Sequence, residues 1–379
     1  MARRNAQQSV AVSRDPSERA SAVQPSLFTP AEPHVLRLLP RKGSLLRPMY
    51  TTDLGMALCG DSLAILKKLP AASVDLVVTS PPYALHYKKE YGNVDKEGYV
   101  GWLLPFAREI RRVLKEDGSF VLNIGGSYNA AQPTRSLYHF KLAIALCERV
   151  GFHLAQECFW FNPAKLPAPA EWVNVRRCRV KDSVEYVWWF SKSPFPAADN
   201  RAVLVPYSDD MKRLLVRGYK SKKRPSGHNI TDKFKLDHGG SIPPNLIVRG
   251  NNESNSDYVK ACARLGVKVH PARFPAALPE FFMKLLSKEG GVVLDPFAGS
   301  NTTGRVAEDL SRRWISIDIE PAYVKASAVR FGLEPLQLVD ADADTRPTIT
   351  PCPDGISYRA PRAAAVKTGL QVRPEGAWS

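Results

Sequence analysis

Residues 74–83 read VDLVVTSPPY, an apolar run that stops abruptly at two adjacent prolines. The run predicts a short buried strand over residues 75–79, because apolar residues fill its centre and β-branched side chains dominate it. The double proline prevents a helix from continuing, so the strand must end in a rigid loop. Residues that precede a proline favour extended backbone, which leaves the Ser80 hydroxyl and the Pro81 carbonyl as outward-facing acceptors beside the ring of Tyr83.

Such a loop is well placed for binding, since ligands of open α/β sheets lie beyond the carboxyl ends of the strands. Two acceptors beside an aromatic ring can hold a flat molecule by its edge. Ser80, Pro81, Pro82 and Tyr83 are therefore candidate catalytic residues. Taken alone, the tetrapeptide is better explained by a proline-stiffened turn, so its function depends on the rest of the chain.

A second loop, DPFAGS at residues 295–300, follows a strand predicted over residues 291–294. Its glycine lets the backbone approach a ligand closely, and the helix predicted over residues 301–310 presents an amide-rich N-terminus. The next predicted strand ends at Asp318, about 20 residues after the glycine, where nucleotide-type folds carry the acidic ligand of a ribose hydroxyl. Glu320 is the near alternative.

The 379 residues suffice for one large α/β domain with a smaller inserted or appended one. Lys and Arg number 53 against 37 Asp and Glu, which gives a net charge of +16. Such an excess suits a polyanionic partner, because each neutralised phosphate releases counterions. A membrane surface would attract the same charge, but the sequence shows neither a long apolar span nor an amphipathic basic helix.

Further strands are predicted over residues 55–59, 118–126, 157–161 and 183–190, and helices over residues 99–114, 137–150 and 278–286.

Cysteine usage predicts a reducing compartment. No C-x-x-C pair occurs, so small core residues are expected, and not a zinc site or a disulfide framework, at Cys59, Cys147, Cys158, Cys178, Cys262 and Cys352. The N-terminal arginines precede no apolar segment of the kind that a signal peptide has. We therefore expect a cytoplasmic protein.

TSPPY resembles the catalytic loop of amino-group DNA methyltransferases, whose pattern is Asp, Asn or Ser, then Pro-Pro and an aromatic residue. Ser in the first place is typical of the cytosine-N4 branch. VLDPFAGSNTTG, residues 293–304, resembles the family's S-adenosylmethionine (AdoMet) loop, and HPARFP, residues 270–275, resembles the segment before it. A catalytic loop that precedes the cofactor loop is the circularly permuted order of the β class. With residues 182–192 and 225–245, the whole of residues 50–333 resembles a PvuII-type modification methyltransferase.

This resemblance implies an α/β fold, the Rossmann-like mixed sheet of AdoMet-dependent methyltransferases with permuted motif order and an inserted DNA target-recognition region. Residues 48–193 would form the catalytic half, residues 194–269 the target-recognition region and residues 270–333 the AdoMet-binding half. Composition predicts a disordered basic arm over residues 1–47 and a disordered tail over residues 334–379. The insert is basic and rich in Gly, Asn and Pro, as in its stretch KSKKRPSGHN, and its Arg and Asn side chains can contact guanine and adenine edges.

The resemblance also implies the ligands and partners. AdoMet is the cofactor, no metal is needed, double-stranded DNA is the substrate, and a cognate restriction endonuclease is the functional partner in a bacterial, nucleoid-associated setting. The DPFAGS loop would hold the methionine end of AdoMet, Asp318 its ribose and Asp61 its adenine side, although Asp61 is explained as well by a helix N-cap. The complete set of expected AdoMet contacts is Asp61, His270, Phe274, Pro275, Asp295, Pro296, Phe297, Ala298, Gly299, Ser300 and Asp318.

The implied reaction acts on a base that has left the duplex, because a stacked amino group cannot be reached. Tyr83 would stack on that base, while Ser80 Oγ and the Pro81 carbonyl would accept hydrogen bonds from its exocyclic amino group. These bonds localise the nitrogen lone pair for attack on the methyl group. Ser80 favours N4 of cytosine; N6 of adenine is the alternative, since adenine also carries an amino group beside a ring nitrogen.

Other functions fit single features only. GSNTTGRV, residues 299–306, nearly matches a P-loop, but it lacks both the Lys that reaches the phosphates and the hydroxyl that binds magnesium. A hydride-transfer enzyme would need G-x-G-x-x-G after a strand. A noncatalytic DNA-binding protein has no use for the SPPY loop and would not bind AdoMet. A C5-cytosine enzyme needs a nucleophilic Cys after a Pro, and the one such pair, Pro351-Cys352, lies in the predicted tail.

Overall fold

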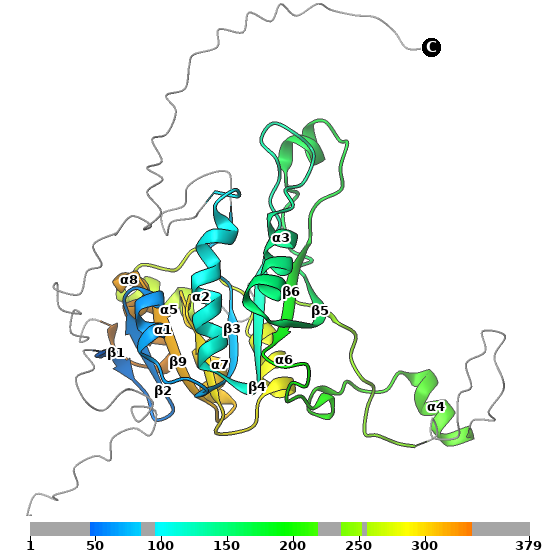
Figure 1. Ribbon diagram of the computed structural model, residues 1–379. Helices are drawn as coiled ribbons and strands as arrows, with labels where there is room; N and C mark the ends of the chain where they lie inside the picture. Colours follow the sequence, from blue (N-terminus) through cyan, green and yellow to red (C-terminus); the bar gives the residue numbers. More distant parts are fainter. Residues whose placement is uncertain (1–45, 85–94, 219–235, 252–255, 336–379) are drawn as a thin grey trace, which may run out of the picture. The chain divides into compact units, whose positions relative to one another are not determined.

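The computed structural model describes residues 46–84, 95–218, 236–251 and 256–335. Within these residues one mixed sheet of nine strands runs in the order β1-β2-β9-β8-β3-β4-β6-β5-β7 (Figure 1). The predicted α/β class and mixed sheet are therefore confirmed. The predicted basic arm and tail lie almost wholly outside the described residues, as does the whole KSKKRPSGHN stretch.

Five parallel strands form the centre of the sheet, namely β2 (Gly55–Cys59), β9 (Arg313–Asp318), β8 (Val292–Asp295), β3 (Val74–Thr79) and β4 (Leu114–Ile124). Parallel strands end at the same edge of a sheet, which we call the carboxyl edge. Because β3 and β8 are neighbours, the two loops singled out in the sequence leave this edge side by side.

Further strands flank this centre. β6 (Val184–Ser191) lies between β4 and β5 (His153–Phe161) and is antiparallel to both, so it begins where they end. The first residues of β6 therefore lie at the carboxyl edge. At the two sides of the sheet, β7 (Leu246–Val248) pairs parallel to β5, and β1 (Pro48–Thr51) pairs antiparallel to β2.

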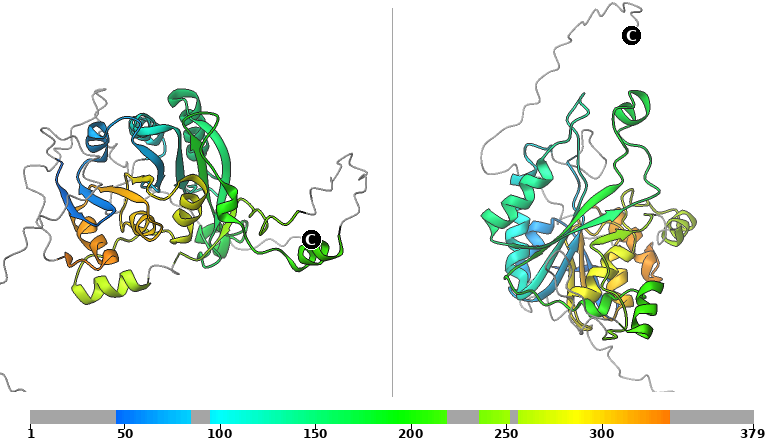
Figure 2. Two further views of the ribbon diagram at one scale, coloured as in Figure 1. Left: turned by 90° about the horizontal axis from the view of Figure 1, so that it is seen from below. Right: turned by 90° about the vertical axis from the view of Figure 1, so that its right-hand side faces the viewer.

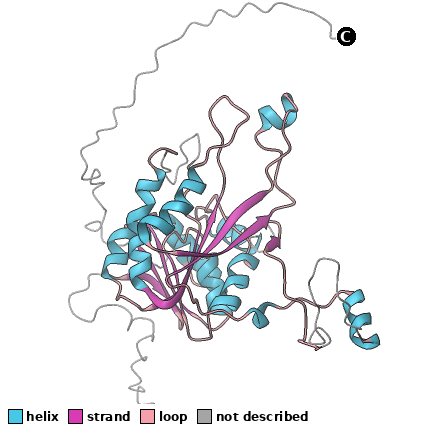
Figure 3. Ribbon diagram, turned by 45° about the vertical axis from the view of Figure 1, so that its right-hand side comes forward, coloured by secondary structure: helices cyan, strands magenta, loops and turns pink. Residues whose placement is uncertain are grey.

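Helices cover both faces of the sheet (Figures 2 and 3). One face carries α1 (Ser62–Lys68), α2 (Tyr99–Val113), α3 (Tyr138–Ala145) and the π-helix η2 (Leu146–Val150). The other carries α6 (Ala277–Leu286), α7 (Thr302–Asp309) and α8 (Pro321–Ser327). Val77 packs into the first apolar layer and its neighbours Leu76 and Val78 into the second, because successive side chains of a strand point to opposite faces.

The segment from residue 194 to 269 contains more regular structure than its composition predicted. It includes the 3-10 helix η4 (Asn200–Val203), α4 (Asp209–Arg217), β7 and α5 (Ser256–Leu265). Contacts with the core override weak local propensity here. The Phe159 amide donates to the Asn245 carbonyl at 2.8 Å beside β7, and α5 buries Tyr258 and Cys262 against Ala326.

Two expectations need correction. β4 and β5 begin at Leu114 and His153, earlier than residues 118 and 157, because pairing with neighbouring strands recruits residues whose own pattern is weak. Among the five described cysteines, Cys158 and Cys262 are buried, Cys59 and Cys147 are half-buried, and Cys178 is exposed, so not all of them are core residues. No helix in the described ranges is long and apolar enough to cross a membrane.

Candidate active site at the carboxyl edge

A buried carboxylate joins the two loops at the carboxyl edge. Asp295, only 1% exposed, accepts a hydrogen bond from Thr79 Oγ1 at 2.6 Å, although 216 residues separate them. It also accepts from Thr303 Oγ1 at 2.6 Å and from the Phe297 amide at 3.1 Å. Burial raises the pKa of Asp295 to about 6 despite these hydrogen bonds. Both carboxylate oxygens of Asp295 are thus hydrogen-bonded within the protein, and these bonds fix the shape of the loop.

Four side chains around the SPPY loop form a closed hydrogen-bond network. The Tyr83 hydroxyl donates to Glu185 Oε2 at 2.8 Å and accepts from Asn123 Nδ2 at 2.9 Å. Ser80 Oγ lies 3.1 Å from the Tyr83 hydroxyl oxygen and accepts from Asn123 Nδ2 at 3.3 Å. Burial, and then the charge of Glu185, raise the pKa of Tyr83 well above its usual value, so the phenol keeps its proton. The sequence suggested a Ser80 hydroxyl that faces outward without a partner. In the structure it is hydrogen-bonded to Tyr83 and Asn123.

The network fixes the direction of each proton. Tyr83 has one hydroxyl proton and donates it in the hydrogen bond to the Glu185 carboxylate, so in the contact between Ser80 and Tyr83 the Ser80 hydroxyl is the donor. Ser80 Oγ accepts one hydrogen bond from Asn123 and keeps a second acceptor site. The arrangement thus makes Ser80 an acceptor toward the site.

The rest of the loop is held rigidly. A Cβ placed on Gly125, just after β4, would lie 2.6 Å from Tyr83 Cε2, so the Tyr83 ring lies directly against this glycine. The Tyr99 hydroxyl donates to the Pro82 carbonyl at 2.8 Å. Pro81 is buried, and no group within the described residues donates a hydrogen bond to its carbonyl.

The sequence did not single out Asn123, Glu185 or Lys165. Asn123 is 2% exposed, and its Oδ1 has no hydrogen-bond partner among the described residues. Lys165 Nζ pairs with Glu185 Oε1 at 3.0 Å. A polar residue inside the apolar stretch FVLNI and an acidic one opening VEYVWWF were the available signals. Lys165, in a loop, gave no signal because only the fold brings it to Glu185.

The glycine loop requires its glycine. Gly299 has a φ of +52°, and a Cβ there would approach His270 Cε1 to 2.8 Å. Its amide donates to Asp318 Oδ2 at 2.8 Å, while the Glu320 amide donates to Asp318 Oδ1 at 3.0 Å. Asp318 therefore shapes the loop and lies at the end of the adjacent strand, as the sequence predicted.

Several predicted cofactor residues make structural contacts. Asp61 caps α1, since its Oδ1 accepts from the Leu63 amide at 2.9 Å. The Phe297 ring packs against Trp102 and Phe106, and Ala298 donates its amide to the Ile317 carbonyl at 2.9 Å. These contacts place the residues at the carboxyl edge and hold them there.

The remaining candidates lie in the glycine loop itself or in the segment of residues 270–275. The Pro296 carbonyl accepts from Ser62 Oγ at 2.6 Å, and the Ser300 carbonyl accepts from Arg330 Nε at 2.6 Å, so both carbonyls face the protein. His270 packs edge-on against Tyr323 with ring centroids 4.5 Å apart. Phe274 packs, partly buried, against the second apolar layer, and Pro275 is buried.

One amide at the predicted amide-rich N-terminus of α7 is already capped by a side chain of the protein. Asn301 has a φ of +54°, and its Oδ1 accepts a hydrogen bond from the Gly304 amide at 3.0 Å. The same oxygen accepts from Ser316 Oγ at 2.6 Å. An anion therefore gains less here than at an uncapped helix.

The charge around the glycine loop suits a cation. Burial raises the pKa of Asp318, and burial followed by the nearby charges of Asp318 and Glu320 raises the pKa of Cys59 to about 11. Acidic groups at raised pKa are stabilised when a positive group arrives. Two acidic side chains, Asp318 and Glu320, thus lie beside the glycine loop, and a cationic group such as the sulfonium of AdoMet would be attracted to them. Within the described residues no cluster of three or more metal-ligating side chains occurs.

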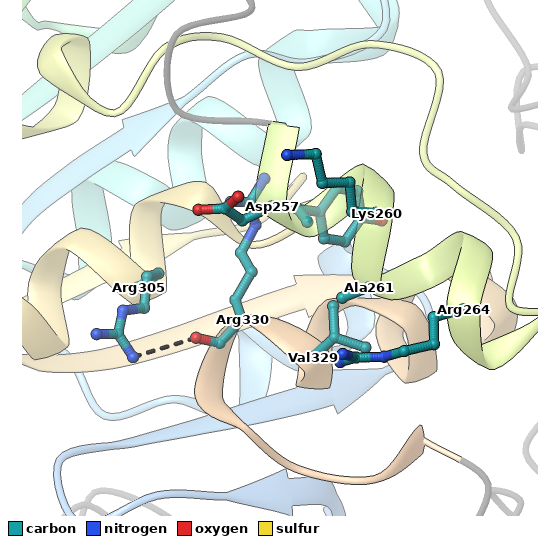
Figure 4. Close-up of a pocket in the computed structure, with 8 residues that line it drawn as sticks. Asp257, Lys260, Ala261, Arg264, Arg305, Val329 and Arg330 are labelled. Carbon is teal, nitrogen blue, oxygen red and sulfur yellow. Dashed lines mark hydrogen bonds between the residues drawn. The ribbon is translucent and has the colours of Figure 1, made fainter.

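A separate cavity of about 520 Å³ lies between α5 and the 3-10 helix η6 (Ala328–Phe331), as Figure 4 shows. Its lining includes Lys260, Arg264 and Arg330, and Arg330 also bonds to Ser300. The SPPY loop does not line it. The cavity therefore lies behind the glycine loop and outside the network around Tyr83.

Known proteins resemble this chain in sequence and in structure. A family model described as DNA methylase matches residues 74–329. Type II methyltransferase M.PvuII of Proteus hauseri is 53% identical over 288 residues, which cover 75% of this chain and 86% of that protein. Type II methyltransferase M.ScaI of Streptomyces caespitosus is 29% identical over 307 residues, 79% of this chain and 88% of that protein.

Among solved structures, PvuII DNA methyltransferase (cytosine-N4-specific) superposes with a TM-score of 0.63 at 45% identity. The superposition covers 77% of this chain and 93% of that chain. The family model spans more than half of the sequence and includes both loops at the carboxyl edge. This chain belongs to the DNA methylase family.

Proposed function

We propose that this protein is a site-specific DNA methyltransferase that moves a methyl group from AdoMet to the exocyclic N4 of a cytosine in a short duplex site. The observation that carries the proposal is the Thr79 to Asp295 hydrogen bond of 2.6 Å, which joins the base of the SPPY loop to the glycine loop. An amino-group acceptor site and a cation-favouring loop therefore adjoin each other. The 53% identity to M.PvuII supports the same activity.

The chain's own residues would position the target base. A base must leave the stack to reach this edge, at a cost of a few kcal/mol. The ring of Tyr83, held by three hydrogen bonds and backed by Gly125, provides a fixed surface for stacking. Ser80 Oγ and the Pro81 carbonyl would accept the two amino hydrogens, which localises the lone pair on nitrogen.

The glycine loop would hold AdoMet, which supplies a methyl group on a cationic sulfonium when bound. Asp318 would accept hydrogen bonds from the ribose, and Asp61 lies at the end of the next strand for the adenine side. His270, Phe274 and Pro275 would pack near the methionine moiety. Asp295 acts on the loop indirectly, because the protein occupies its oxygens.

We assign sequence recognition to residues 194–269 and the two methyltransferase halves to residues 48–193 and 270–333. Both relatives, M.PvuII and M.ScaI, are type II methyltransferases, which favours a role in restriction and modification. A cognate restriction endonuclease would then be the functional partner, and the protein would work on nucleoid DNA in a bacterial cytoplasm.

The product decides between the two amino-group reactions. Duplex DNA incubated with the enzyme and AdoMet is digested to nucleosides and analysed by mass spectrometry, and N4-methylcytosine is expected. N6-methyladenine as the sole product would overturn the assignment to cytosine. The Ser80→Ala variant, which removes one acceptor, serves as the control for contaminating activities.

A further inference from the structure

The connection between β5 and β6, residues 162–183, forms a finger at the carboxyl edge. It leaves β5 after Phe161 and enters β6 at Val184, so both of its ends lie at the same edge of the sheet as the SPPY loop. Figures 1 and 3 show it extending beyond the sheet, with the π-helix η3 (Glu171–Val175) near its tip. The sequence analysis placed this segment in the catalytic half, residues 48–193, and outside the predicted target-recognition region.

The base of the finger is fixed to the active-site network. Lys165 of the finger pairs with Glu185, and Glu185 accepts a hydrogen bond from the Tyr83 hydroxyl. Asp182 pairs with Arg135 of the β4–α3 loop at 2.8 Å. Ion pairs therefore anchor both ends of the finger, and the Lys165 pair joins it directly to the network around Tyr83.

The finger is basic, and most of its cations are exposed. The segment contains five Lys and Arg against two acidic residues, a net charge of +3. Both acidic residues form ion pairs within the protein: Glu171 pairs with Arg176 at 2.9 Å, and Asp182 pairs with Arg135. Arg177 and Lys181 are exposed, and neither pairs with a carboxylate in the described part of the chain.

Apolar side chains interleave with these cations. Val175 and Val180 are 70% and 86% exposed. The alternation of cations and apolar groups suits a nucleic-acid backbone with its sugars better than water or a charged protein surface. A polyanion is also what the net charge of the chain favours.

We propose that this finger is a second DNA-contacting element, which holds the phosphate backbone beside the displaced base through Arg176, Arg177 and Lys181. The inference rests on the proposed function, because that function places duplex DNA across the carboxyl edge. A contact fixed to Tyr83 through Glu185 would align the duplex with the base site without reading sequence.

The test combines Arg176→Ala, Arg177→Ala and Lys181→Ala and measures DNA affinity against salt concentration. Each lost phosphate contact lowers the slope of log K against log salt by about 0.9, so a fall of roughly 2 to 3 is expected. Binding should weaken alike for a substrate duplex and for an unrelated duplex. AdoMet affinity, measured by calorimetry, should not change.

A matched control removes three exposed cations at the opposite edge, through Lys67→Ala, Lys68→Ala and Arg149→Ala. These residues end α1 and η2, which run back from the carboxyl edge. The control should leave the salt slope nearly unchanged. Equal slopes for the finger variant and wild type would overturn the proposal, as would a changed oligomeric state with unchanged DNA binding. If wild type methylates no DNA, the proposed function fails, while the salt slopes still decide the role of the finger.

Discussion

Gly125 provides a sharp test of how far the position of the Tyr83 ring controls methyl transfer. A Cβ on this residue would lie 2.6 Å from Tyr83 Cε2 and 2.8 Å from Tyr83 Cδ2. Carbon atoms in contact stay about 3.5 to 4.0 Å apart, so Gly125→Ala must push the ring away by about 1 Å.

That displacement acts on the hydrogen bonds of the Tyr83 hydroxyl. Its bonds to Glu185 and Asn123 measure 2.8 and 2.9 Å, and a further 1 Å would stretch both beyond hydrogen-bonding distance. A bond to a neutral group contributes about 1 kcal/mol and one to a charged group about 1.5 to 3 kcal/mol. The free energy of unfolding should therefore fall by roughly 2 to 4 kcal/mol.

The effect on catalysis should be larger than the effect on cofactor binding. A displacement of about 1 Å from productive geometry slows a reaction by on the order of 10². Single-turnover methylation at saturating AdoMet and calorimetric titration of AdoMet separate the two quantities. The rate should fall by that factor, whereas AdoMet affinity should change little, because the glycine loop is untouched.

Gly101→Ala is the matched control. Gly101 lies in α2 with no atom within 4 Å of its added Cβ, so this variant should gain about 0.5 to 1 kcal/mol of stability and keep its rate. A wild-type single-turnover rate in Gly125→Ala would refute the role given to the ring. A parallel loss of AdoMet affinity would instead indicate general unfolding.

Three further variants test the assignment of the two loops. Ser80→Ala should slow single-turnover methylation by on the order of 10² to 10³ at any AdoMet concentration, and rescue by more AdoMet would contradict its role as base acceptor. Asp318→Ala removes a charged acceptor worth about 1.5 to 3 kcal/mol, so calorimetry should show AdoMet affinity lowered roughly ten- to a hundredfold, with activity returning at saturation. The folded-state pKa of Asp295 is raised to about 6, so its stabilising effect is complete below pH 4 and is lost as pH rises through 6. The free energy of unfolding, measured with urea, should thus rise in Asp295→Asn relative to wild type by up to about 3 kcal/mol when the pH is changed from 4 to 7. A difference between the two proteins that does not depend on pH would contradict the shifted pKa.

The sequence was sufficient to predict the central strands and the loops that follow them. Apolar runs identified β3 and β8, and prolines and a glycine marked where the chain leaves the sheet. These signals are local, because a buried strand needs neighbouring apolar residues and a left-handed φ at Gly299 needs a residue without a Cβ. The pairing of β7 with β5 depends on a distant partner, and no local pattern announced it.

The same distinction applies to the active site. Sequence alone placed Ser80, Tyr83 and Asp318 at or just after the ends of predicted strands, since the apolar runs that end there are local features of the chain. Only the tertiary structure decided what surrounds them. Tyr83 meets Asn123 and Glu185 because β6 runs antiparallel beside β4 and brings its first residues to the carboxyl edge. Strand order and direction are properties of the whole sheet, and they determine the proton directions that make Ser80 an acceptor.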